Sequence, residues 1–190
     1  MESYVKDYED IPYELLNGQI VYMSPRPSTI HNKAPSNIFS IFHYYLKGKK
    51  CIPFSDGVDV FLDENNNVIP DVTIVCNPDI VKNDGIYGAP DLVVEVLSPT
   101  TANNDKGYKK KLYGKHGVKE YWIVDTNSKS VEIYLPKDGV LELINIYSIF
   151  PDYILIKMNQ EEKEKIAKEF KTSLFDDLVI KLEDIFYRID

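Results

Sequence analysis

The sequence has few of the residue types on which several classes of protein depend. Of its 190 residues only two are cysteines, and the formal net charge is −8. No stretch approaches the roughly 20 consecutive apolar residues of a membrane-spanning helix, and the first residues hold several acids but no apolar run of signal-peptide length. We therefore expect a cytoplasmic protein without membrane partners.

The two cysteines, Cys51 and Cys76, are 25 positions apart. They form no Cys-x-x-Cys pair and no histidine cluster accompanies them, so neither a zinc site nor a disulfide framework is favoured. The sequence predicts that both are buried free thiols.

Acidic residues outnumber basic ones by 30 to 22, which argues against a protein that coats nucleic acid through bulk charge but leaves a local basic site open. Residues 1–95 contain 14 acids and 7 bases, whereas residues 96–190 contain 16 acids and 15 bases. With two arginines in the chain, no arginine-rich recognition element is present. One basic stretch without an acid contains Lys106, Lys109, Lys110, Lys111, Lys115 and Lys119.

What is present is typical of a globular protein, with 44% hydrophobic and 27% charged residues. The length suits a single domain over 1–190. Apolar periodicity and turn residues predict three strand pairs, over 13–23 with a turn at Asn17-Gly18, over 58–76 with strands 58–62 and 68–76, and over 130–147. They also predict a loop over 24–27 and a helix from Ser28 or Thr29 to about Lys47.

The middle and the end of the chain complete the expected fold. A strand over 91–97, a helix over 105–116 and a strand over 120–125 predict a right-handed crossover between parallel strands. Residues 160–171 predict a short solvated helix, and residues 173–189 predict a tail that packs back on the domain. The fold class is α/β, with a mixed β-sheet core flanked by helices.

Two acids interrupt apolar strands. Glu95 lies within Asp-Leu-Val-Val-Glu-Val-Leu, and Asp71 follows Pro70 in Val-Ile-Pro-Asp-Val. Because a buried carboxylate is costly without a partner, each is a candidate for a functional role. A structural ion pair for Glu95 and an exposed strand end for Asp71 are the alternatives.

A helical wheel separates Lys109 from the other lysines of the basic stretch. At 100° per residue, Lys109 falls within the arc of Tyr108, Leu112 and Tyr113, so it is expected to point inward. An inward lysine needs an acidic partner or a reactive role, unless its stem only covers apolar surface. Two acids on neighbouring strands and an inward lysine are typical of metal-dependent hydrolysis, in which Mg²⁺ binds oxygen ligands and activates water.

In this order the motifs resemble the Uma-type restriction endonuclease family, within the PD-(D/E)XK nuclease superfamily. The resemblance covers about residues 10–135, with a weaker match at 173–175. The matching stretches are Tyr13 to Gly18, Ser24-Pro25 with His31, Pro70-Asp71-Val72, Pro90 to Pro99, Asp105 with Lys109 and Tyr113, Gly117-Val118 and Glu120 to Asp125.

The resemblance implies a restriction-endonuclease-like fold and Mg²⁺-dependent hydrolysis of DNA by a metal-activated water, with Mn²⁺ as a substitute. It implies that Asp71 and Glu95 bind the metal, with the backbone carbonyl of Val96 as third ligand. The superfamily lysine normally lies two residues after the second acid, where this chain has Leu97. Lys109 is expected to take its place as a catalytic residue.

Other residues have weaker expectations. Glu14 and His31 are candidate accessory residues, although His31 could be a capping or packing residue instead. Asp105 is expected to be a helix N-cap, and Tyr121 and Trp122 are expected in the core.

Three readings of the function remain open. The favoured one is a DNA endonuclease, with a homodimer expected by analogy alone. The second is an inactive nuclease-fold module that binds nucleic acid or a protein. The third is a two-carboxylate hydrolase acting on another substrate, such as a glycoside.

Overall fold

A six-stranded mixed sheet forms the centre of the computed structural model, which describes residues 11–23, 28–55 and 57–189. The expected loop over 24–27 lies outside the described residues. In spatial order the central strands are β12 (Val140–Ser148), β11 (Ser130–Lys137), β10 (Glu120–Asp125), β9 (Leu92–Val96), β6 (Val72–Val75) and β3 (Ile52–Ser55).

Strand β9 lies inside this sheet, and all five of its residues are buried. It runs parallel to β10 and antiparallel to β6. The connection from β9 to β10 is helical, with α2 (Ala102–Asn104), a π-helical turn η3 (Asp105–Lys109) and α3 (Lys110–His116) following one another directly. The predicted strand–helix–strand unit is therefore confirmed, although the helix begins three residues earlier than expected.

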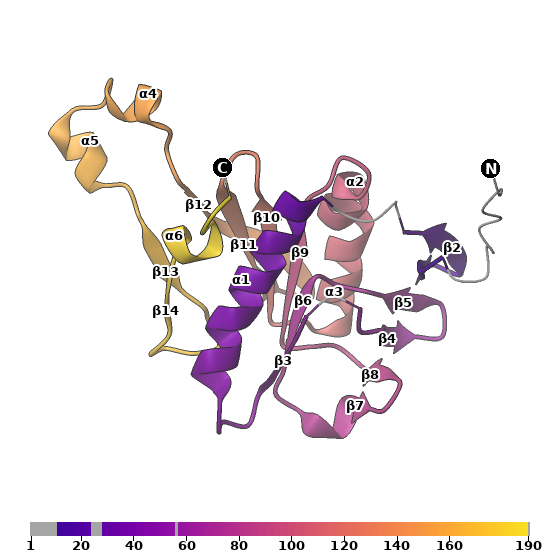
Figure 1. The fold of residues 1–190 in the computed structure, drawn as a ribbon. Helices are drawn as coiled ribbons and strands as arrows, with labels where there is room; N and C mark the ends of the chain where they lie inside the picture. Colours follow the sequence, from indigo (N-terminus) through magenta and orange to yellow (C-terminus); the bar gives the residue numbers. More distant parts are fainter. Residues whose placement is uncertain (1–10, 24–27, 56, 190) are drawn as a thin grey trace, which may run out of the picture.

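Helix α1 (Thr29–Leu46) covers one face of the central sheet (Figure 1). Ser28 caps it as expected, because its hydroxyl accepts a hydrogen bond from the backbone N–H of His31 at 3.1 Å. The buried face of α1 packs in one cluster with Trp122 and with the C-terminal segment, so the predicted return of the tail is confirmed. The tail contributes Leu178, Ile180, Leu182, Ile185, Phe186 and Ile189, and Phe170 ahead of the tail lies in the same cluster.

A second six-stranded sheet lies on the α3 side of the molecule (Figure 1). Its strands in spatial order are β2 (Gln19–Tyr22), β1 (Tyr13–Leu16), β5 (Asn66–Val68), β4 (Val60–Asp63), β8 (Gly85–Tyr87) and β7 (Val81–Lys82). A short 3₁₀ turn, Pro78–Ile80, precedes β7. The predicted turn at Asn17-Gly18 joins β1 to β2, and both residues have positive φ (53° and 75°) as a tight hairpin requires.

The expected continuous strand from 68 to 76 is wrong. β5 ends at Val68 in the second sheet, and β6 begins at Val72 in the central sheet. Pro70 lies between them and has no N–H for a ladder, so the chain changes sheets at this point. This change places Asp71 at the junction of the two sheets.

The helix expected over 160–171 is also shorter than predicted. Helices α4 (Asp152–Leu155) and α5 (Gln160–Glu164) form an arm that projects from the body (Figure 1). The chain then forms β13 (Glu169–Lys171), which pairs with β14 (Val179–Lys181) ahead of the final helix α6 (Leu182–Ile185). Burial of Phe170 against Trp122 and Tyr147 favours the extended conformation there.

The two cysteines are not free thiols, because Cys51 and Cys76 form a disulfide. Cys51 directly precedes β3, and Cys76 directly follows β6. In this antiparallel pair Ile52 is opposite Val75, so the next residues outward are opposite each other. Strand register brings the two thiols together, which a spacing of 25 residues does not reveal.

Candidate active site

Asp71 and Glu95 meet where β6 enters the central sheet. In the β6–β9 register Val72 is opposite Val94, so Asp71, one residue before β6, lies across from Glu95. The carboxylate of Asp71 accepts a hydrogen bond from the backbone N–H of Val96 at 2.6 Å. The structure thus brings together the two acids that the sequence placed on neighbouring strands.

Lys109 reaches the same place from the helical crossover. Its residue exposure is 3%, which confirms the inward direction from the helical wheel. Its Nζ lies 3.1 Å from Glu95 Oε1, 2.6 Å from Glu14 Oε1 and 3.6 Å from Asp105 Oδ1. The lysine is therefore surrounded by three buried carboxylates.

Glu14 comes from β1 of the second sheet. Its Oε1 also accepts a hydrogen bond from the backbone N–H of Ile69 at 2.9 Å, in the segment just before Asp71. The second sheet therefore contributes Glu14 to the site, and the hydrogen bond from Ile69 fixes the Glu14 carboxylate against the connection between β5 and β6.

Asp105 is not the helix N-cap that the sequence predicted. The helical segment begins at Ala102 with Thr101 in the N-cap position, and Asp105 begins the π-helical turn inside it. Asp105 is 1% exposed, and its carboxylate faces Lys109 one turn later. A π-helical turn inside an α-helix is frequent at functional sites, and this one places Asp105 and Lys109 on the side of the two acids.

Tyr113 is a site residue to which the sequence assigned no role. It is fully buried, and its hydroxyl donates a hydrogen bond to Glu95 Oε1 at 2.7 Å. The available signal was its place four residues after Lys109, on the same inward face of the helix.

His31 contacts the backbone on the other side of Glu95. Its Nε2 lies 2.7 Å from the carbonyl oxygen of Val96. A carbonyl can only accept, so Nε2 carries the hydrogen. Since the N–H of Val96 donates to Asp71, both polar groups of this residue are held in place.

The buried charges shift one another's protonation. Burial raises the pKa of Glu95 well above its ordinary value, although the Lys109 ammonium opposes the shift. Burial likewise raises the pKa of Asp105 against the same ammonium. For Lys109, burial alone would lower the pKa, but Glu95, Glu14 and Asp105 outweigh it and raise the pKa above its ordinary value. Lys109 is thus protonated at neutral pH.

The donor atoms suit a hard divalent cation. Glu14, Asp71, Glu95 and Asp105 supply four carboxylates against the single ammonium of Lys109. Within the described residues no three Asp, Glu, His or Cys side chains form a ready-made metal cage. Mg²⁺ does not need one, because it is commonly bound by one or two carboxylates with waters and substrate phosphates.

The lysines of the basic stretch have different environments. Lys106 pairs with Glu132 at 2.7 Å and Lys119 pairs with Asp91 at 2.7 Å. Lys111 and Lys115 are exposed, and neither forms an ion pair with the described residues. These two ammonium groups are therefore available to an anion.

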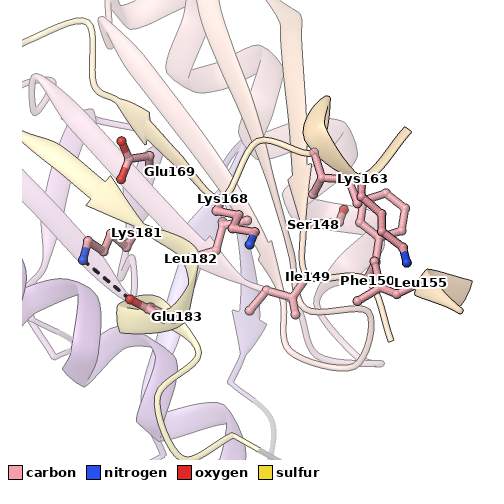
Figure 2. A pocket seen from close by; sticks show the side chains of 11 residues that line it. Ser148, Ile149, Phe150, Leu155, Lys163, Lys168, Glu169, Lys181, Leu182 and Glu183 are labelled. Carbon is pink, nitrogen blue, oxygen red and sulfur yellow. Dashed lines mark ion pairs between the residues drawn. The ribbon is translucent and has the colours of Figure 1, made fainter. Parts of the chain in front are cut away.

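One cavity lies away from the acids around Lys109. A cavity of about 580 Å³ opens between the end of β12, the α4–α5 arm and the β13–β14 hairpin, as Figure 2 shows. Its lining includes Ile149, Phe150, Leu182 and the Lys181–Glu183 ion pair, and none of the acids around Lys109. The cavity is therefore separate from the acid cluster and contributes no residue to it.

The fold is shared with a solved structure. That protein is described as "a putative nuclease belonging to DUF820 from Anabaena variabilis", and the TM-score is 0.68 at 21% sequence identity over 92% of this chain and 89% of the other. The comparison confirms the α/β class with mixed sheets and flanking helices.

None of the helices in the described part of the chain has both the length and the apolar character that a membrane span requires.

Sequence comparison gives the family. The model "Uma2: Putative restriction endonuclease" matches residues 1–169, so the chain belongs to the Uma2 family. A protein of Synechocystis sp., described as "Uncharacterized protein slr1290", is 32% identical over 128 residues, which are 66% of this chain and 67% of that protein. The family expected from the motifs is thereby confirmed.

Proposed function

We propose that this chain is a Mg²⁺-dependent endonuclease that hydrolyses phosphodiester bonds in DNA. The observation that carries the proposal is the meeting of Asp71, Glu95 and Lys109 at one end of β9, from three separate elements. Membership of the family described as "Putative restriction endonuclease" agrees with this chemistry.

Asp71, Glu95 and the backbone carbonyl of Val96 are the groups that would hold the cation. Bound Mg²⁺, or Mn²⁺ in its place, would supply Lewis acidity toward a phosphoryl oxygen and lower the pKa of a bound water. His31 and Asp71 fix the Val96 peptide, so its carbonyl has a defined direction. A carbonyl oxygen has two lone pairs, so the His31 hydrogen bond leaves one for a ligand.

Lys109 acts through its charge. Because its pKa is raised, it does not serve as a general base at neutral pH. It neutralises part of the acid cluster and offers a positive charge to the negative charge that develops on the phosphate. Glu14 holds it in this position at 2.6 Å.

DNA contact is confined to a small basic area. Lys111 and Lys115, which are exposed on α3, are the ammonium groups that would contact DNA phosphates, while the net charge of −8 opposes broad binding. Partners on this proposal are DNA and, for cutting both strands, a second copy of the chain. Sedimentation velocity tests the dimer directly.

Two features favour the inactive module: the lysine missing at Leu97 and the net charge of −8. Lys109 lies 3.1 Å from Glu95 and supplies that charge from another element, which favours the catalytic reading. A lysine shared among the acids likewise weighs against a glycoside hydrolase, which needs one free acid and one free base.

The test is cleavage of plasmid and linear DNA with Mg²⁺ or Mn²⁺, with and without chelator. Asp71→Asn and Glu95→Gln should abolish cleavage, while Glu142→Gln, at an exposed acid on β12, should retain it. Absence of metal-dependent cleavage by the wild type, or equal cleavage by Glu95→Gln, would contradict the proposal.

A further inference from the structure

Two hydrogen-bond donors converge on one oxygen of Glu95. The hydroxyl of Tyr113 lies 2.7 Å from Oε1, and Nζ of Lys109 lies 3.1 Å from the same atom. Within the described part of the chain, the hydrogen bonds to Glu95 all end on Oε1. Both donors therefore hold the carboxylate by one oxygen, and Oε2 is left for a ligand.

The two donors are not equivalent. Lys109 is shared, since Glu14 lies nearer to its Nζ than Glu95 does and Asp105 lies within 3.6 Å. The ammonium can shift toward any of these acids, and a substrate phosphate would attract it as well. The Tyr113 hydroxyl has Glu95 as its single acceptor among the described residues.

The surroundings of Tyr113 make this donor rigid. Its ring is fully buried in the cluster that includes Leu112, Val118 and Tyr121, and it lies 5.1 Å from the Tyr121 ring. A closely packed ring keeps its rotamer, so the hydroxyl position is fixed before any ligand arrives. Packing of α3 against β10 therefore sets the direction of the Glu95 carboxylate.

We propose that Tyr113 is the positioning residue of the site, which holds Glu95 by Oε1 so that Oε2 faces the divalent cation. This inference rests on the proposed function. It assigns no contact with substrate to Tyr113, which acts through Glu95. Partners of this kind, one step removed from a metal, typically change metal affinity or activity by roughly 10- to 100-fold when removed.

The test compares Tyr113→Phe with Tyr121→Phe. Both remove one hydroxyl from neighbouring buried rings, but the Tyr121 hydroxyl donates to the backbone carbonyl of Asp105 at 3.0 Å rather than to Glu95. Mn²⁺ binding is measured by titration calorimetry, cleavage by its dependence on metal concentration, and folding by thermal melting. Tyr113→Phe should raise the Mn²⁺ dissociation constant by roughly 10- to 100-fold, and Tyr121→Phe should leave it unchanged.

A second arm keeps the inference testable if Tyr113→Phe is less stable. In a Glu95→Gln background, Tyr113→Phe should have no further effect on residual Mn²⁺ binding, because its role passes through that carboxylate. Equal binding by wild type and Tyr113→Phe would overturn the inference alone, as would equal losses in both tyrosine variants. Failure of the wild type to bind Mn²⁺ or to cleave would overturn the proposed function with it.

Discussion

Replacing Lys109 by Met should remove the positive charge that partly neutralises the buried acid cluster. At an effective dielectric constant of about 20, each of the three contacts, at 2.6, 3.1 and 3.6 Å, amounts to about 5–6 kcal/mol of attraction. Desolvation of the charges offsets most of this, and removal of one partner from a buried ion pair typically costs about 3–5 kcal/mol. Because domains are stable by only about 5–15 kcal/mol, the variant has little margin.

The loss of stability in Lys109→Met should increase as the pH rises. Burial raises the pKa of Glu95 above the unfolded value near 4.3, so the native state keeps a proton that the unfolded chain has released. The extra bound proton stabilises the native state at low pH, and this stabilisation is lost as the pH rises from about 4.3 toward the raised native pKa of Glu95. Without the Lys109 ammonium the main group that opposes the shift is gone, so the pKa of Glu95 should rise further and the loss of stability should grow with pH, by at most about 1.4 kcal/mol per pH unit.

Urea unfolding at pH 5, 6, 7 and 8 measures this dependence. Lys111→Met is the matched control, because it removes an exposed ammonium two residues away and should change stability by no more than about 0.5 kcal/mol. Mn²⁺ should restore part of the Lys109→Met loss by supplying positive charge. A Lys109→Met protein with wild-type stability, and with wild-type pH dependence from 5 to 8, would refute the electrostatic reasoning.

Three further predictions concern the scaffold. Glu120→Ala should lower the free energy of unfolding by about 3 kcal/mol, because the fully buried carboxylate accepts hydrogen bonds from Trp122 Nε1 and from the C-terminal segment. Urea unfolding, followed by the fluorescence of the single tryptophan, tests this, and an unchanged midpoint would contradict it. The double variant Cys51→Ser, Cys76→Ser should lower the free energy of unfolding by about 3–4 kcal/mol, because the disulfide no longer closes a 25-residue loop in the unfolded chain. Reduction of the wild type should lower its melting temperature by the same amount, and insensitivity to reductant would count against the disulfide. Gly114→Ala should cost about 1–3 kcal/mol, because its Cβ would lie 2.9 Å from a backbone carbonyl next to β12; a melting temperature at or above that of the wild type would show that the α3–β12 contact can relax.

The sequence by itself determined the family, the α/β class and the short-range elements. The β1–β2 hairpin follows from Asn17-Gly18 and α1 from its apolar spacing, because turns and amphipathic helices depend on neighbouring residues. The inward direction of Lys109 was found for the same reason. Asp71 and Glu95 were recognised because charge in an apolar strand is conspicuous.

Only the tertiary structure decided what these residues meet. Register between β6 and β9 sets Asp71 across from Glu95, and the second sheet brings Glu14 to Lys109. The same kind of register pairs Cys51 with Cys76. Strand register depends on contacts between distant segments, for which local sequence patterns carry little information.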